Sequence, residues 1–426
     1  MNRRLISTAI GLALTSGYAV ANNAITDNTN DDYVVAGDYI QIAVPATGLL
    51  AAWLYDDAEG AKQLTYSLAT TVGIVQAGKF AVGRIRPNAS NTASFPSGHT
   101  AAAFSGAAFL QTRYGAKWGI PGYAAATFVG MSRIHGNRHY ADDVLAGAGI
   151  AFLTNQFFVS EYTPEGVSFG AAPMKDGMML NVSVTNEALD YESDRQRNNP
   201  TYPSKKRHSF TLDIGFNTYD TMADLGANQT IKNSAPLDPY QPYATALYEY
   251  KIDDSTSLEV LLSPNETRRS GKVTEGFQLD NVTYTAGEEV FLALRQWSTG
   301  ASYIKHFELN DQLTLSAGAG LYAYLIELEA DRSNGGAHAA LTSYPVLPSF
   351  TGKLDYQFHQ DWSLRGKFDF QALSDDRAFA SEAGVNYTIN PEWDVAMKYA
   401  YTDNRWGKSK VRFKSESVVL SVTNHF

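Results

Sequence analysis

The spacing of apolar and polar residues changes along the chain and divides it into two halves. From about residue 39 to 160, apolar residues, many of them Ala and Gly, recur with the 3.6-residue period of helices. Gly and Pro interrupt this pattern at positions such as Gly60, Pro87 and Gly115. The pattern predicts helices at about 39–55, 62–84, 98–113, 118–133 and 141–159.

The second half has the period of 2 that is typical of strands. Apolar and charged residues alternate from Trp362 to Ala372, for example, so one strand face is apolar and the other charged. The alternation predicts ten strands, at about 209–220, 241–252, 257–268, 294–309, 312–328, 345–358, 361–375, 379–389, 392–404 and 411–426. Residues 178–189 can form a further strand, so eight or twelve strands are also possible.

Very short polar turns and longer polar loops separate these strands in turn. Short turns at one end and long loops at the other are typical of bacterial outer-membrane barrels. The last strand ends at Phe426, as the C-terminal strand of such barrels does. A soluble antiparallel sandwich alternates in the same way. It requires neither the loop asymmetry nor the terminal Phe, so an antiparallel transmembrane β-barrel is favoured. Its even strand number places the first and the last strand end of the barrel segment in the periplasm.

The first residues have the layout of a secretory signal peptide. Arg3 and Arg4 precede an apolar run, and the small residues Ala19 and Ala21 fit a cleavage site. The apolar run is too short to span a bilayer, which takes about 20 helical residues, so a retained membrane anchor is disfavoured. The predicted organisation is a multidomain protein: signal peptide 1–21, all-α helical domain 22–165, linker 166–206 and barrel 207–426.

Composition excludes several classes of protein. The chain has no cysteine, so it has no disulfide framework and no thiolate metal site. Its net charge of −10 argues against nucleic-acid binding, which needs a basic face. Aromatic residues make up 12% of the chain and suit the interfacial girdles of a membrane barrel. The partners expected from the barrel half are the lipids of the outer membrane.

None of the predicted helices has the composition of a membrane span. The best candidate, "IQIAVPATGLLAAWLY", contains a proline, and the other helices carry Lys, Gln, Asn or Arg. A chain that inserts a barrel must also cross the periplasm without leaving helices in the inner membrane. We therefore expect the helical domain to lie in the periplasm, tethered under the outer membrane.

Three clusters of basic and polar residues lie in the helical half. Lys79 and Arg86 are seven residues apart, about two helical turns, so both cations can face one side. In "PSGH", Ser97 can cap the helix that follows, and Gly98 lets the backbone approach a ligand closely. Free amides and the positive dipole end of that helix suit an oxyanion.

The third cluster is Arg133, His139 and Asp143. His139 and Asp143 are four residues apart at the start of a helix, so the carboxylate can contact the imidazole and fix its tautomer. His135 and Asp142 are nearby; a loop position and a charge at the helix start, respectively, explain them. Residue types and spacing alone support an anion site with two histidines.

In this order, K-x6-RP, PSGH and SR-x5-H-x3-D are the motifs of the type 2 phosphatidic acid phosphatase superfamily, which includes bacterial acid phosphatases and vanadium haloperoxidases. The chain resembles this family over about residues 60–150, in "KFAVGRIRP", "PSGHTAAAF" and "SRIHGNRHYADDVLAG". The resemblance implies a helical phosphatase without metal or other cofactor. It implies phosphate binding by Lys79, Arg86, Ser97, Gly98 and Arg133.

The resemblance also implies the roles of the remaining motif residues. His139, held by Asp143, is the nucleophile and forms a phosphohistidine, and His99 protonates the leaving group and then activates water. The expected substrates are lipid phosphates: phosphatidic acid, phosphatidylglycerol phosphate or a lipid A phosphate. An alternative is a polyprenyl diphosphate such as undecaprenyl diphosphate. A porin or adhesin with a periplasmic plug and a vanadate-dependent haloperoxidase are alternatives of other classes.

A lipid substrate would require an apolar entry beside the phosphate site. Exposed aromatic residues are the natural wall of such an entry, although aromatic residues of a helical domain are equally explained by core packing. The candidates in the helical half are Trp53, Tyr55, Phe80, Phe95 and Trp118.

Overall fold

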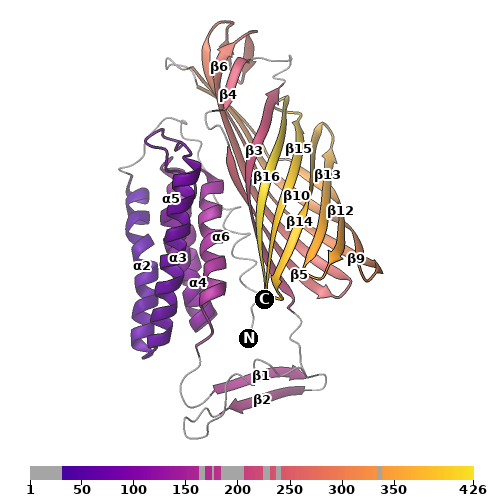
Figure 1. Cartoon of the computed structure of the whole chain (residues 1–426). Coiled ribbons are helices and arrows are strands. Elements are labelled where there is room, and N and C mark those ends of the chain that lie inside the picture. The colour runs from indigo at the N-terminus through magenta and orange to yellow at the C-terminus, as the bar shows by residue number, and fades with distance from the viewer. Residues whose placement is uncertain are drawn as a thin grey trace.

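A bundle of helices lies beside a barrel of strands (Figure 1). The computed structural model describes residues 31–162, 168–174, 177–183, 206–223, 231–236, 241–332 and 338–426. The predicted signal peptide and most of the predicted linker lie outside these residues.

The five predicted helices are confirmed. Asp31 begins the first helix, where its side chain accepts a hydrogen bond from the amide of Tyr33, and Asp57 caps the next through the amide of Gly60 at 2.8 Å. Gly83 ends that helix with φ +63°, a left-handed conformation that suits glycine. The helices are α2 (Asp32–Leu54), α3 (Ala58–Val82), α4 (Gly98–Tyr114), α5 (Ala116–His135) and α6 (Ala141–Phe158).

The ten predicted strands form a closed antiparallel ring. Each strand pairs with its neighbours in chain order, and the last pairs with the first, with Leu420 opposite Ile214. Closure excludes the sandwich, because a sandwich leaves edge strands. The ring consists of β3 (His208–Ala223), β5 (Pro242–Asp253), β6 (Thr256–Val273), β9 (Glu289–Asn310), β10 (Leu313–Arg332), β12 (Val346–His359), β13 (Trp362–Leu373), β14 (Asp376–Asn390), β15 (Trp393–Trp406) and β16 (Val411–His425).

Shorter strands lie outside the ring. At the end with the long connections, β4 (Ile231–Pro236) pairs with the last residues of β6, and β11 (His338–Ser343) pairs with the last residues of β10. There β7 (Phe277–Leu279) also pairs with β8 (Val282–Tyr284). The further strand predicted at 178–189 corresponds to β2 (Gly177–Ser183). It pairs only with β1 (Ser168–Met174), so it adds nothing to the barrel.

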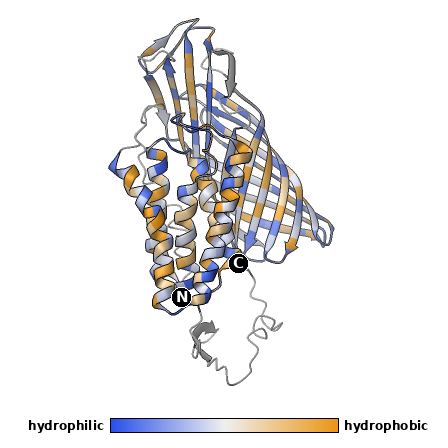
Figure 2. Cartoon of the chain, turned by 60° about the vertical axis from the view of Figure 1, so that its left-hand side comes forward, coloured by the Kyte–Doolittle hydropathy of each residue, from blue (hydrophilic) through white to orange (hydrophobic). Residues whose placement is uncertain are grey.

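The two faces of the barrel wall have opposite character, as the alternating colours of the strands in Figure 2 show. Outward residues are large and exposed, among them Leu321 at 62% and Met397 at 64%. Inward residues include ion pairs such as Lys398 with Asp213 at 2.9 Å. An apolar outside and a polar inside are the pattern of a barrel that crosses a membrane.

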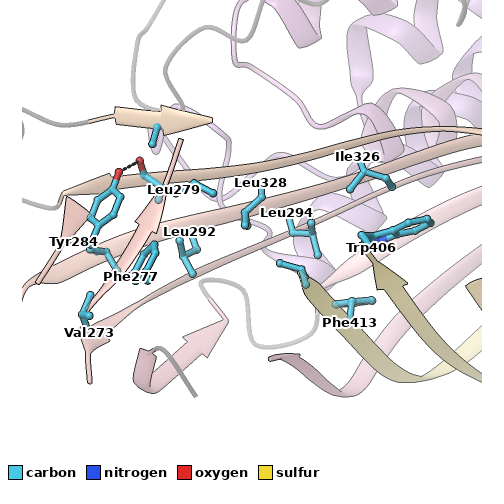
Figure 3. Packing of buried hydrophobic residues seen from close by; sticks show 14 of the residues in the cluster. Val273, Phe277, Leu279, Tyr284, Leu292, Leu294, Ile326, Leu328, Trp406 and Phe413 are labelled. Carbon is cyan, nitrogen blue, oxygen red and sulfur yellow. Dashed lines mark hydrogen bonds between the residues drawn. The ribbon is translucent and has the colours of Figure 1, made fainter. Parts of the chain in front are cut away.

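Apolar side chains fill the barrel at the end with the long connections (Figure 3). Residues from opposite sides of the ring meet there, including Leu294 and Leu328 on one side and Trp406 and Phe413 on the other. The β7–β8 hairpin folds onto the same cluster, where the hydroxyl of Tyr284 donates to the carbonyl of Ala330 at 2.6 Å. This apolar cluster therefore joins opposite sides of the ring at this end.

Helix α6 packs against the outer wall of the barrel. Its residues Ile150 and Leu153 share a buried cluster with Leu212 and Ala244, which point outward from β3 and β5. The approach is close, because a Cβ added at Gly149 would lie 2.7 Å from the side chain of Leu212. Small residues on both surfaces let helix and strands meet, so the bundle lies beside the barrel along its length.

Helix α2 is longer than the sequence predicted, because it begins at Asp32 instead of near residue 39. With 23 residues it is long enough, and by composition apolar enough, to cross a membrane; its apolar stretch has a mean hydropathy of 1.4. The expectation that no helix meets this criterion was therefore wrong for α2. A third of the apolar stretch is buried inside the protein, so the same helix also serves the bundle core.

Candidate active site

The three motif clusters converge at one end of the helix bundle. The end of α3, the start of α4, the end of α5 and the start of α6 meet there. Lys79 and Arg86 are close enough to His139 to lower its pKa electrostatically, and Arg133, His139 and Arg86 act on His99 in the same way. Side chains up to 60 residues apart in sequence therefore share one electrostatic site.

His139 and Asp143 form the centre of this site, and both are buried. The Nδ1 atom of His139 lies 3.5 Å from Oδ2 of Asp143, just outside hydrogen-bonding geometry, so a small rotation completes the bond. Burial first of all lowers the pKa of His139, to about 4. The imidazole is therefore neutral near pH 7, as a nucleophile requires.

A buried guanidinium fixes Asp143. Arg84 Nη1 lies 2.7 Å from Oδ1 of both Asp142 and Asp143, and all three side chains are almost fully inaccessible to water. Burial raises the pKa of Asp143, but the attraction of Arg84, the nearby imidazole of His139 and a hydrogen bond from Ser94 outweigh it, so its pKa lies below the ordinary value. Asp143 is thus a charged acceptor that can hold the imidazole.

Asp38 in α2 joins the second histidine to an arginine. Its Oδ1 atom accepts a hydrogen bond from Arg133 Nη1 at 2.5 Å and lies 3.2 Å from His99 Nε2. Burial and Arg133 lower the pKa of His99 to about 4. The carboxylate of Asp38 thus holds the guanidinium of Arg133 and the imidazole of His99 close to each other.

The remaining predicted ligands surround the same end. Lys79 Nζ donates to the carbonyl of Ala93 at 2.6 Å, and burial and Arg86 lower its pKa to about 8. Burial also lowers the pKa of Arg86. Among the described residues, no carboxylate lies within hydrogen-bonding distance of either cation, and such partly buried cations are well suited to hold an anion.

Ser97 does not cap α4 as predicted. It occupies the N-cap position, but its hydroxyl pairs with the hydroxyl of Thr100 at 2.9 Å, and its amide donates to the carbonyl of Asp143. Gly98 lies beside Lys79, whose Cε atom would be 3.8 Å from an added Cβ. The start of α4 is therefore tied directly to the start of α6.

Several residues of the site escaped the sequence reasoning. Asp38 lies outside every motif, and no local signal marks it. Arg84 stands within "KFAVGRIRP", where only its burial distinguishes it from a surface charge. Asp142, predicted to be a charge at the helix start, is a buried partner of Arg84. His135 ends α5 instead of lying in a loop, and it contacts Asp31 at the rim.

The five aromatic residues suggested for an apolar entry do not lie together. Trp118 donates to the hydroxyl of Tyr55 at the opposite end of the bundle, where α2 ends with Trp53 nearby. Phe95 is buried in the core. Phe80 follows Lys79 and is 95% exposed, so of the five it alone projects outward from the helix turn that carries the site.

A cavity of about 260 Å³ lies elsewhere, at the short-turn end of the barrel. Polar residues of the lumen, including Asp355 and Arg365, line it. Since none of the predicted site residues lines it, this cavity is not the predicted phosphate site.

Comparison with known proteins relates the helical part to a phosphatase family. Residues 60–163 match the PAP2 superfamily. The lipid A 1-phosphatase of Porphyromonas gingivalis is 34% identical over 139 residues, which are 30% of this chain and 31% of that protein. The lipid A 4'-phosphatase of Helicobacter pylori is 36% identical over 80 residues, 19% of this chain and 40% of that protein. The matches span less than half the length of either relative.

Solved structures resemble the barrel part. The outer membrane protease OmpT of Escherichia coli is 9% identical, with a TM-score of 0.37 over 53% of this chain and 99% of that chain. The translocator domain of the autotransporter NalP from Neisseria meningitidis is 13% identical, with a TM-score of 0.33 over 55% and 92%. These scores are low, so the barrel assignment depends on the strand pairing itself. Residues 60–163 are thus a PAP2 superfamily domain, and the chain joins this domain to a ten-stranded antiparallel barrel.

Proposed function

We propose that this chain is a phosphatase of lipid phosphomonoesters that its own barrel anchors in the outer membrane. The observation that carries the proposal is the convergence of the buried imidazole of His139 and the partly buried imidazole of His99, both neutral, with Lys79, Arg86 and Arg133 at one end of a PAP2 domain. A phosphomonoester carries up to two negative charges, and its transition state spreads further charge over the equatorial oxygens. Three cations around one point match that charge.

The chemistry proposed has two steps. With Nδ1 turned toward Asp143, the Nε2 lone pair of His139 attacks phosphorus in line, and an N–P bond forms as the P–O bond to the lipid breaks. His99 gives a proton to the leaving alkoxide. His99 then takes a proton from water, whose oxygen attacks phosphorus, the N–P bond breaks and inorganic phosphate leaves. No metal takes part in either step.

Protonation of His99 must accompany substrate binding. The pKa of His99 is lowered to about 4 by burial and by Arg133. A phosphate dianion placed beside the imidazole would offset the repulsion from Arg133 and raise this pKa, since an opposite charge favours the protonated form. The substrate would thereby help to charge the acid that releases its own leaving group.

Lipid A phosphate is the substrate favoured within the predicted set. Both curated relatives carry lipid A phosphatase names, although they match only part of this chain. A barrel embedded in lipid brings the domain to phosphorylated lipids without diffusion through water. Phosphatidic acid, phosphatidylglycerol phosphate and polyprenyl diphosphates are therefore the comparison substrates.

Release of inorganic phosphate from a panel of these lipids tests the proposal. The purified full-length chain should release phosphate in the presence of a chelator, most rapidly from lipid A phosphate. His139→Ala should lose at least about 1,000-fold of this rate, as removal of a nucleophile does. His208→Ala, in the barrel, is the matched control. Equal rates for the chain and His139→Ala would exclude the assigned nucleophile.

A further inference from the structure

The two ends of the barrel differ, and their difference orients the protein. At one end the strands are joined by tight turns, such as Asp254 to Ser255 between β5 and β6, and Phe426 exchanges backbone hydrogen bonds with His208 there. At the other end β6 and β9 are joined through residues 274–288, which include the β7–β8 hairpin. Short turns of bacterial outer-membrane barrels face the periplasm, and long loops face outward.

Helix α6 runs from the long-loop end to the short-turn end. Its last turns contact the short-turn end, where the ring of Phe152 lies 5.9 Å from that of Phe426 and Phe157 lies 6.2 Å from Trp393. Its first residues contact the opposite end, where Arg268 of β6 lies 4.8 Å from the ring of Tyr140. Since His139 and Asp143 flank Tyr140, the candidate active site lies at the long-loop end.

The band of outward apolar residues on the barrel, here called the apolar belt, ends close to the level of this site. On β10 the outward positions from Leu315 to Leu325 are all apolar, and Glu327 follows. Ten residues span about 33 Å along a strand, or about 25 Å of height at the usual tilt, which is the height of a barrel's apolar band. Glu327 pairs with Arg295, and Arg295 with Glu266, so a charged row on three strands marks the upper edge of the belt.

The site is attached directly above this row. Arg268 stands two residues beyond Glu266, pairs with it at 2.7 Å, and donates to the carbonyl of Pro87 at 3.1 Å. Pro87 follows Arg86, one of the predicted phosphate ligands. The phosphate-binding cations are therefore at the height where lipid headgroups begin, with the apolar belt below them.

The helix bundle continues the apolar surface of the barrel below this level. Exposed apolar side chains project from α2, including Ile42 at 65% and Trp53 at 76%, and from α3. These helices stand beside the barrel in Figures 1 and 2. Exposed apolar side chains on a protein already crossing a membrane are best covered by the same lipid. Phe80, almost fully exposed beside Lys79, would lie where acyl chains meet headgroups.

We propose that the catalytic end of the helix bundle faces the outer surface of the cell, so that it acts on phosphorylated headgroups of lipids in the outer leaflet. The identity of the reaction rests on the proposed function, but the orientation does not. This placement differs from the periplasmic one expected from the sequence. It follows from the packing of α6 on the outer wall of the barrel, with the start of the helix at the long-loop end.

Single cysteines can test the orientation, because the natural chain has none. Thr92→Cys marks the exposed loop beside the site, and Lys117→Cys marks an exposed position at the opposite end of the bundle. In the barrel, Asn281→Cys marks the long connection and Asp254→Cys a short turn. Each full-length variant is expressed in Gram-negative cells and treated with a membrane-impermeant maleimide, before and after permeabilisation of the outer membrane.

We expect Thr92→Cys and Asn281→Cys to be labelled on intact cells, and Asp254→Cys only after permeabilisation. Lys117→Cys should follow Asp254→Cys. Labelling of Thr92→Cys only after permeabilisation, with Asn281→Cys labelled on intact cells, would overturn the proposal. Phosphate release is measured separately on the same variants. Labelling of Thr92→Cys on intact cells without phosphatase activity would reject the proposed function but keep the orientation. Phosphatase activity with labelling of Thr92→Cys only after permeabilisation would keep the proposed function but reject the orientation.

Discussion

Arg268 of barrel strand β6 donates from Nη1 to the carbonyl oxygen of Pro87 at 3.1 Å, across the junction between the barrel and the helix bundle. The two residues are 181 positions apart in the chain. The same guanidinium lies 4.8 Å from the ring of Tyr140, and Arg84 lies 3.8 Å from that ring. The amide of Tyr140 in turn donates to Asp143 at 2.9 Å. The barrel thus contacts the residues that position the predicted nucleophile, so it is more than an anchor.

Replacement of Arg268 should therefore slow the reaction without weakening substrate binding. In Arg268→Ala the Tyr140 ring and the 84–93 loop lose a fixed partner, so His139 is held less accurately. We expect kcat to fall about 10- to 100-fold, as small misplacements of catalytic groups do, with KM changed less than about twofold. Steady-state kinetics on the full-length protein measures both.

A control for this prediction is Arg332→Ala, which removes an arginine from the same end of the barrel, where it pairs with Glu288. It should keep the normal kcat. Partial recovery by Arg268→Lys would agree with a positioning role. A rise in KM with unchanged kcat would instead show that Arg268 contributes to binding.

Asp38 should compete with the phosphate for Arg133 and His99. Its carboxylate contacts both groups, at 2.5 Å and 3.2 Å, and it adds a negative charge next to an anion site. Asp38→Asn removes this charge and should tighten inhibition by inorganic phosphate or vanadate about 3- to 5-fold, the size expected for a half-exposed ion pair. Asp32→Asn, on the same helix but away from these contacts, should leave inhibition unchanged. Weaker inhibition in Asp38→Asn would show that the carboxylate supports the anion site.

The pH dependence should reveal the charge of Lys79. Burial and Arg86 lower its pKa to about 8, so the ammonium is charged below this pH and becomes neutral above it. A neutral amine binds phosphate less well, so kcat/KM should fall as pH rises through about 8. Lys79→Arg keeps the charge at high pH and should move the fall upward by at least about one unit. Lys62→Arg, exposed on the first turns of α3, should not move it. A profile unaffected by Lys79→Arg would assign the titration to another group.

Close contact between α4 and α6 should make Gly147 sensitive to a single methyl group. A Cβ at this position would lie 2.5 Å from the carbonyl oxygen of Ser97, whereas nothing lies within 4 Å of one added at Gly73. Gly147→Ala should destabilise the helix bundle by about 1–3 kcal/mol and lower activity, because the start of α4 must move. Gly73→Ala should be neutral or stabilise by up to about 1 kcal/mol. Thermal unfolding followed by helical circular dichroism compares them; equal midpoints would contradict the close packing.

The repeating patterns of the sequence determined the elements. Periods of 3.6 and 2 predicted the five helices and the ten strands of the ring, because each element must present one apolar face. The short turns predicted which strands are neighbours. The motifs predicted the composition of the site, since Lys79, Arg86, His99, Arg133 and His139 stand at fixed distances from helix ends that themselves have sequence signals.

Only the tertiary structure decided which residues support the site and where the site lies. Arg84 meets Asp142 across 58 positions, Arg133 meets Asp38 across 95, and Arg268 meets Pro87 across 181. A period or a motif describes neighbours along the chain, so it carries no information about partners at such separations. The outward residues Leu212 of β3 and Ala244 of β5 likewise resemble any lipid-facing residue until α6 packs on them. Docking of α6 on the outer wall fixes the height of the site relative to the membrane, and it depends on two surfaces that only folding brings together.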